Sequence, residues 1–150
     1  MSRLPDPGGP VYCEEFPVPP QAVDVNGHVN NVVYVQWMQD MAVHHSDAVG
    51  GTRAMSEAGG RWVVRAHRVE YLAPAFEGDR IRVATWVADF RRVRSLRRYR
   101  FERASDGLLL ARGETDWVFV DAATGRPRTV PDDLRRRFPL HAAAGPEAGE

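Results

Sequence analysis

The chain has 150 residues, 43% of them apolar, which suffices for one domain with a sizeable core and is too short for two ordinary domains. Twenty acidic residues balance twenty basic ones, all of them arginine, so no global field favours nucleic acid or a membrane surface. Cys13 is the single cysteine, which excludes an intrachain disulfide and gives no support for an oxidising compartment. No leader or membrane-spanning apolar run is recognisable, so we expect a cytoplasmic protein without membrane insertion.

The two ends of the chain differ in composition from its middle. Residues 1–10 and 139–150 are rich in Pro, Gly and Ala and lack a periodic apolar face, which predicts flexible tails around one domain of residues 11–138. Residues 11–18 suit a short strand. Prolines at positions 17, 19 and 20 limit its ladder hydrogen bonds and favour a place at a sheet edge or a turn.

Residues 31–49 have the pattern of one long helix. Polar side chains follow one another at intervals of one to four residues along a single stripe, at Gln36, Gln39, Asp40, His44 and Asp47. The remaining apolar arc is too wide for a helix that merely lies on a surface, so we expect other elements to wrap it. Glycine pairs at 50–51 and 59–60 then bracket residues 52–58, which we interpret as a helical turn or loop.

Four extended segments follow, at about residues 62–71, 80–90, 95–103 and 108–121. Short turn signals and no helix-length pattern separate them, which predicts antiparallel pairing of neighbouring strands as a meander. A curved antiparallel sheet wrapped around the long helix satisfies both patterns, an α+β fold. A final helical turn is expected over residues 131–138, because proline is favourable at the first helical position.

The segment between the first strand and the helix contains a specific motif. Residues 24–34 read Asp-Val-Asn-Gly-His-Val-Asn-Asn-Val-Val-Tyr. This string resembles the signature of the 4-hydroxybenzoyl-CoA thioesterase branch of the hotdog superfamily, and similar strings at residues 69–75, 78–79, 124–127 and 130–131 extend the resemblance over residues 11–138. It implies a hotdog fold, a homodimer or homotetramer, and hydrolysis of acyl-CoA thioesters. We expect no cofactor and no metal.

The motif also fits thioester hydrolysis on chemical grounds. The reaction needs an attacking oxygen on one side of the carbonyl and hydrogen-bond donors where negative charge accumulates. Asn30 or Asn31 is a favoured N-cap, so unpaired helix amides near Asn31 form a candidate oxyanion site. Gly27 permits the tight turn that brings Asp24 to the same acyl carbon. The resemblance implies that Asp24 is the nucleophile or the general base, and the sequence leaves the two roles open.

Other residues near the motif are interpreted as follows. His28 is a candidate active-site donor, although a lone His near a helix start is more often a turn or subunit-contact residue. Gly27, Asn30 and Tyr34 are candidate substrate contacts, with a core position as the alternative for Tyr34. The family pattern often has a second acid at position 22, which is alanine in this chain, so Asp24 is the only acid in the turn. Some relatives have Glu in the helix where this chain has Gln39, and the adjacent Asp40 is a reserve candidate.

An arginine cluster provides a candidate site for the nucleotide of CoA. It flanks the turn near residue 93 and consists of Arg91, Arg92, Arg94, Arg97, Arg98, Arg100 and Arg103. Guanidinium groups suit pyrophosphate and ribose phosphate. The resemblance implies substrate contacts for Arg92, Arg94 and Arg128, and Ser95 lies among them. A solvated strand face would show the same alternation of arginines.

Several functional alternatives remain open at the level of the sequence. Adjacent His44 and His45 point about 100° apart on a helix, so we do not expect a metal-ligand pair. The acyl group and its carrier are open, because hydrolysis of acyl carrier protein thioesters would use the same motif. A non-catalytic acyl-CoA-binding protein is the alternative from a different class. Hydration of an enoyl thioester is disfavoured, because the motifs of hotdog dehydratases do not occur.

Overall fold

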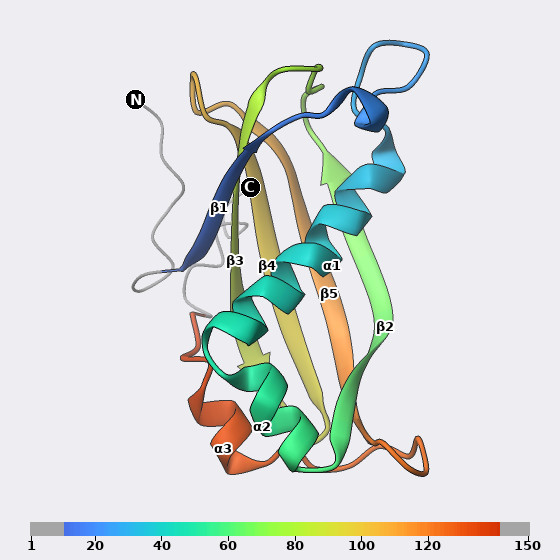
Figure 1. Cartoon of the computed structure of the whole chain (residues 1–150), viewed down its shortest axis with the longest axis vertical. Coiled ribbons are helices and arrows are strands. Elements are labelled where there is room, and N and C mark those ends of the chain that lie inside the picture. The colour runs from blue at the N-terminus through green and yellow to red at the C-terminus, as the bar shows by residue number, and fades with distance from the viewer. Residues whose placement is uncertain (1–10, 142–150) are drawn as a thin grey trace.

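The computed structural model describes residues 11–141, in which an antiparallel sheet curves around one long helix (Figure 1). Of the two predicted tails, residues 1–10 and 142–150 lie outside the described residues. Residues 139–141 are described, and the His141 N–H donates a hydrogen bond to the Val87 carbonyl at 3.0 Å. The end of the described chain therefore lies against the sheet.

Each predicted element is present with boundaries within two residues of those expected. The strands are β1 (Tyr12–Pro17), β2 (Gly60–Tyr71), β3 (Arg80–Phe90), β4 (Arg94–Arg103) and β5 (Leu109–Asp121). The helices are α1 (Asn31–Ala48), α2 (Gly51–Glu57) and α3 (Asp132–Arg136), and a 3-10 turn, Pro20–Ala22, follows β1. Local periodicity and turn residues thus determine these boundaries.

The five strands are arranged in the order β1-β3-β4-β5-β2, with every pair antiparallel. The expected meander is correct for β3, β4 and β5 and wrong for β2, which pairs with β5 and not with β3. The connection at residues 72–79 joins β2 to β3 and passes the ends of β5 and β4, which lie between them. It therefore spans three inter-strand spacings of about 4.8 Å each. Eight residues reach about 26 Å, so this connection is long enough. The edge position predicted for β1 is confirmed.

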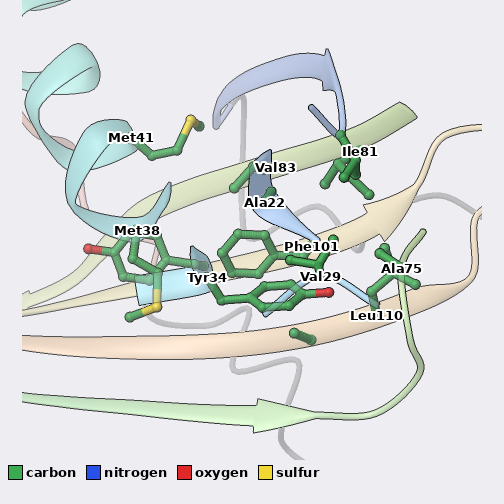
Figure 2. Close-up of a cluster of buried hydrophobic side chains, with 13 residues drawn as sticks. Ala22, Val29, Tyr34, Met38, Met41, Ala75, Ile81, Val83, Phe101 and Leu110 are labelled. Atoms are coloured by element: carbon green, nitrogen blue, oxygen red, sulfur yellow. The ribbon is translucent and has the colours of Figure 1, made fainter. Parts of the chain in front are cut away.

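The helix α1 packs on the concave face of the sheet through a largely apolar side (Figure 2). Tyr34 and Met38 are buried there, and the Tyr34 ring meets Phe101 of β4 edge-on at 5.1 Å. A Cβ at Gly113 of β5 would lie 2.8 Å from the Met38 sulfur, so the glycine allows the close approach of helix and sheet. This contact determines where both ends of α1 lie.

The opposite side of α1 is only partly covered by the described chain. Val32 and Val43 on the helix are 73% and 52% exposed, and Val63 and Val64 on the edge strand β2 are also exposed. The predicted wrapping of the helix is therefore one-sided within a single chain. Within residues 11–141, no helix combines the length and the apolar character that crossing a membrane requires.

A second apolar cluster lies at the end of the sheet where α1 finishes. The short helices α2 and α3 pack there against β3 and β5 through Ala54, Val87, Phe119, Val130, Leu134 and Phe138. This cluster closes one end of the fold, and the turn that precedes α1 lies at the other end (Figure 1).

Candidate functional site

Residues 23–29 form a tight hydrogen-bonded turn just before α1. Val23 and Val29 pair as an antiparallel bridge. The Asp24 N–H donates to the His28 carbonyl at 2.9 Å, and the Gly27 N–H donates to the Asp24 carbonyl at 3.0 Å. Gly27 has φ of 83°, a conformation that side-chain-bearing residues rarely adopt. The glycine in the motif thus has the predicted backbone role.

The Asp24 carboxylate is held within this turn by its own backbone. Oδ1 accepts a hydrogen bond from the Asn26 N–H at 2.9 Å, which is an Asx turn. None of the described residues donates to Oδ2 or forms an ion pair with this carboxylate. Asp24 is partly exposed, so one oriented oxygen remains accessible from outside the chain.

The first turn of α1 begins directly beside this carboxylate-bearing turn. Asn30 is the N-cap, and its Oδ1 accepts the Val32 N–H at 3.0 Å. The Asn30 N–H donates to the Ala22 carbonyl at 2.9 Å, which ties the helix start to the segment that carries Asp24. The N–H of Asn31, the first helical residue, has no partner within its helix and no acceptor among the described residues. This amide is the candidate oxyanion donor.

Tyr71, at the end of β2, anchors the helix start from a distant part of the chain. Its hydroxyl donates to the Asn31 carbonyl at 2.7 Å, and its ring meets Tyr34 at 5.4 Å. Sequence reasoning did not assign Tyr71 a role at the site, although it belongs to one of the strings that resemble the family. Its contact with Asn31 depends on the way the sheet curves over the helix, which no local pattern shows.

The structure places His28 at the surface and Tyr34 in the core. His28 is exposed, pairs through its backbone with Phe76, and places its ring edge-on to the Phe76 ring at 5.2 Å. Tyr34 is 3% exposed within the core, and burial raises the pKa of its hydroxyl to about 12. The His28 ring thus contacts the connection between β2 and β3, and the Tyr34 ring packs between helix and sheet.

The residues expected to contact the nucleotide lie at the other end of the sheet. Arg94 pairs with Asp116, and the Ser95 hydroxyl donates to the Asp89 carbonyl at 2.9 Å. Arg128 lies over the Phe119 ring at 5.7 Å. The exposed Arg92 lies between β3 and β4. The eleven residues of β3 span roughly 35 Å, so one chain does not bring these side chains to the Asp24 turn.

The two adjacent histidines of α1 point to different partners. His44 Nδ1 lies 2.8 Å from a Glu14 carboxylate oxygen, and His45 Nδ1 accepts a hydrogen bond from Arg97 at 2.8 Å. Asp40, the reserve acid, accepts a hydrogen bond from the Gln36 side chain at 2.9 Å on the exposed face. Within residues 11–141, no three ligating side chains gather as a metal site would require.

A pocket of about 190 Å³ opens between the C-terminal half of α1 and the sheet. Sequence reasoning did not predict it. Most of the lining side chains are apolar, and Arg97 is the one charged group among them. The lining includes Val43, Trp62, Phe90, Trp117 and Phe138. Its lining comes from four strands, from α1 and α2, and from Phe138, a combination that only the folded chain produces.

Comparison with known proteins establishes the class to which this fold and motif belong. The profile of the thioesterase-like superfamily matches residues 18–138, and the chain belongs to that superfamily. It is similar to the solved structure of a 1,4-dihydroxy-2-naphthoyl-CoA thioesterase from Synechocystis, with a TM-score of 0.76, 18% identity, and coverage of 85% of this chain and 95% of that one. The hotdog fold expected from the motif is thereby confirmed.

Two plant thioesterases are also similar to this chain. A chloroplastic acyl-[acyl-carrier-protein] hydrolase of Cuphea viscosissima is 24% identical over 140 residues, which are 89% of this chain and 34% of that protein. The structure of a 12:0-ACP thioesterase from Umbellularia californica has a TM-score of 0.76 and 23% identity, with 91% of this chain and 50% of that chain covered. The chain spans about a third of the length of the curated relatives that it matches.

Replacement of the N-cap tests how the helix start is held. We expect Asn30→Ala to lower the free energy of unfolding by about 0.5–2 kcal/mol, because the Val32 N–H loses its acceptor. Asn30→Asp keeps an acceptor at the same place and should retain most of the stability. Urea unfolding of the three proteins measures both effects, and equal losses in the two variants would show that the cap contributes nothing.

The pH dependence of stability tests the half-buried His45. Burial, followed by the nearby Arg97 charge, lowers the pKa of His45 from 6.5 to about 3. Between these values the unfolded chain binds a proton that the folded chain does not, so stability falls as the pH drops from about 6.5 to about 3. His45→Asn retains an acceptor without this titration, and its melting temperature should fall less between pH 7 and pH 4.

The neighbouring histidine supplies the control for that experiment. His44→Asn removes an exposed ring that contacts Glu14, and its melting temperature should fall at least as steeply as that of the wild type. A reduced fall in His44→Asn, with an unchanged fall in His45→Asn, would contradict the assignment.

Proposed function

We propose that this protein hydrolyses acyl-CoA thioesters, with Asp24 supplying the attacking or base-catalysing oxygen and the Asn31 N–H polarising the carbonyl. The observation that carries the proposal is the hydrogen-bonded unit that joins the two groups. The Val23–Val29 bridge and the bond from the Asn30 N–H to the Ala22 carbonyl hold the Asp24 turn beside the start of α1. An oriented carboxylate oxygen and an unpaired helix amide are thus adjacent.

This arrangement suits both routes of hydrolysis. The positive end of the helix dipole and the Asn31 N–H stabilise the negative charge that forms on the thioester oxygen. If Asp24 attacks directly, the carboxylate displaces the thiolate and forms an anhydride, which water then hydrolyses. If Asp24 acts as a general base, it takes a proton from the attacking water, and the departing thiolate receives one. Both routes release a carboxylic acid and a thiol.

The role proposed for the arginine cluster requires a second copy of the chain. Arg92 and Arg94 lie at the junction of β3 and β4, and Arg128 follows β5, at the opposite end of the sheet from the Asp24 turn of their own chain. Antiparallel association of two β2 edges about a two-fold axis would bring this end of one copy toward the Asp24 turn of the other. The similar Synechocystis structure is a CoA thioesterase and the similar plant proteins act on acyl carrier protein, so both carriers belong in the assay.

The exposed apolar side chains favour this self-association. Val32 and Val43 are exposed on α1, and Val63 and Val64 are exposed on β2, the open edge strand of the sheet. A free edge with apolar side chains is a template for pairing with another strand. We therefore propose a homodimer as the basic assembly, and a homotetramer would be a pair of such dimers.

Replacement of the carboxylate tests the proposed chemistry. Asp24→Asn should lower kcat/KM for thiol release at least about 100-fold, because a general base usually contributes about that factor or a larger one. A panel of aryl, short-chain and long-chain acyl groups, each carried by CoA and by acyl carrier protein, defines the substrate as well. Higher kcat/KM on the CoA series would support the proposed carrier.

Asp106→Asn is a matched control, because Asp106 accepts the Leu108 N–H at 3.0 Å in a turn of the same kind. It should retain the wild-type activity. Full turnover by Asp24→Asn on every accepted substrate would refute the proposal. Tight binding of acyl-CoA by a wild type that hydrolyses none of it would favour the non-catalytic alternative.

The assembly is tested at the β2 edge. Val64→Lys should raise the Kd of the dimer at least tenfold, because a lysine on an open edge opposes strand pairing. Leu108→Lys, at an exposed apolar position between β4 and β5, should leave the Kd unchanged. Light scattering over a dilution series measures both, and a monomeric wild type at all concentrations would exclude the proposed dimer.

A further inference from the structure

The pocket at the C-terminal half of α1 combines an apolar lining with one buried positive charge. Val43, Trp62, Phe90 and Phe138 contribute apolar surface, and Arg97 of β4 is the charged residue in the lining. We propose that this pocket binds a small organic carboxylate with an apolar body about the size of one ring, and that its carboxylate pairs with Arg97.

The Arg97 guanidinium lacks a counter-charge within the described chain. The residue is 5% exposed, and its Nη1 donates to the Thr85 hydroxyl at 3.0 Å and to His45 Nδ1 at 2.8 Å. Both acceptors are neutral, since burial holds the pKa of His45 at about 3. No carboxylate within residues 11–141 forms an ion pair with Arg97. Burial of an unpaired charge is costly unless a partner supplies the opposite charge.

The neighbouring arginines of β4 differ from Arg97, because acidic side chains neutralise their charges. Arg94 and Arg98 face the other side of the sheet, where Arg94 pairs with Asp116 and Arg98 pairs with Glu114 at 3.1 Å. Arg97 faces α1 and is held in place by neutral groups, including the Phe138 ring at 5.6 Å. The described part of the chain thus fixes this guanidinium beside an apolar cavity without neutralising it.

The size of the cavity limits the apolar part of the ligand. An apolar cavity of about 150 Å³ accommodates benzene. The pocket, at about 190 Å³, therefore fits one six-membered ring or a short branched chain. Among the hydroxyls of the lining, that of Ser95 already donates to the Asp89 carbonyl at 2.9 Å and that of Thr52 to Asp47 at 2.6 Å. Arg97 is the charged group of the lining and is therefore best suited to bind the carboxylate.

This site is separate from the acyl carbon that the same chain's Asp24 would attack. Asn31 and Val43 are twelve residues apart on α1, which corresponds to about 18 Å along the helix axis. A carboxylic acid is the class of product that thioester hydrolysis releases. The inference nevertheless rests on the pocket alone and does not require hydrolysis by Asp24.

Calorimetric titration of the full chain with two isosteric ligands tests the inference. Cyclohexanecarboxylate and cyclohexanecarboxamide have the same shape, and only the first has a charge. We expect the carboxylate to bind at least tenfold more tightly than the amide, because only the carboxylate neutralises Arg97. Arg97→Met should abolish this preference, whereas Arg98→Met, on the opposite face of the same strand, should preserve it.

The comparison of the two ligands stands even if Arg97→Met fails to fold, because it uses the wild type. Equal affinities for the acid and the amide, or binding of neither, would overturn the proposal. A preference for the acid that survives in folded Arg97→Met would overturn it as well. Thiol release is measured separately, so loss of the proposed hydrolysis and loss of this binding site are distinguishable outcomes.

Discussion

The packing of α1 against the concave face of the sheet is the contact on which the rest of the structure depends. Met38 reaches Gly113 of β5, and Tyr34 meets Phe101 of β4, so the helix cannot slide along the strands without a clash or a cavity. Its N-terminus therefore lies beside the Asp24 turn and its C-terminal half lies over the pocket. One apolar interface thus places two chemically different candidate sites at opposite ends of the same helix.

The two ends of the helix use charge in different ways. At the N-terminus, the amide of Asn31 provides a partial positive charge without any ionised side chain, and the Asp24 carboxylate lies in the adjoining turn. At the other end, Arg97 provides a full positive charge within an apolar lining. The first arrangement suits a transient oxyanion, whereas the second suits a stable anion.

Within the single chain, apolar side chains stay exposed and the candidate nucleotide site is separated from the Asp24 turn. The outer side of α1 and the edge strand β2 expose Val32, Val43, Val63 and Val64. The arginines suited to a nucleotide lie far from the Asp24 turn of the same chain. The proposed association through the β2 edge would account for both, because it would cover these side chains and bring opposite ends of two copies together.

The sequence by itself determined the elements, their boundaries and the turn that carries Asp24, because helical and strand periodicity, Gly27 and the Asn30 cap all act over a few residues. The motif also identified the family. Only the tertiary structure decided that β2 pairs with β5, that Tyr71 anchors Asn31, and that Arg97 is buried in a pocket with no counter-charge from residues 11–141. These features join residues that lie far apart in the chain. Their partners depend on how the sheet curves over the helix, which local patterns do not specify.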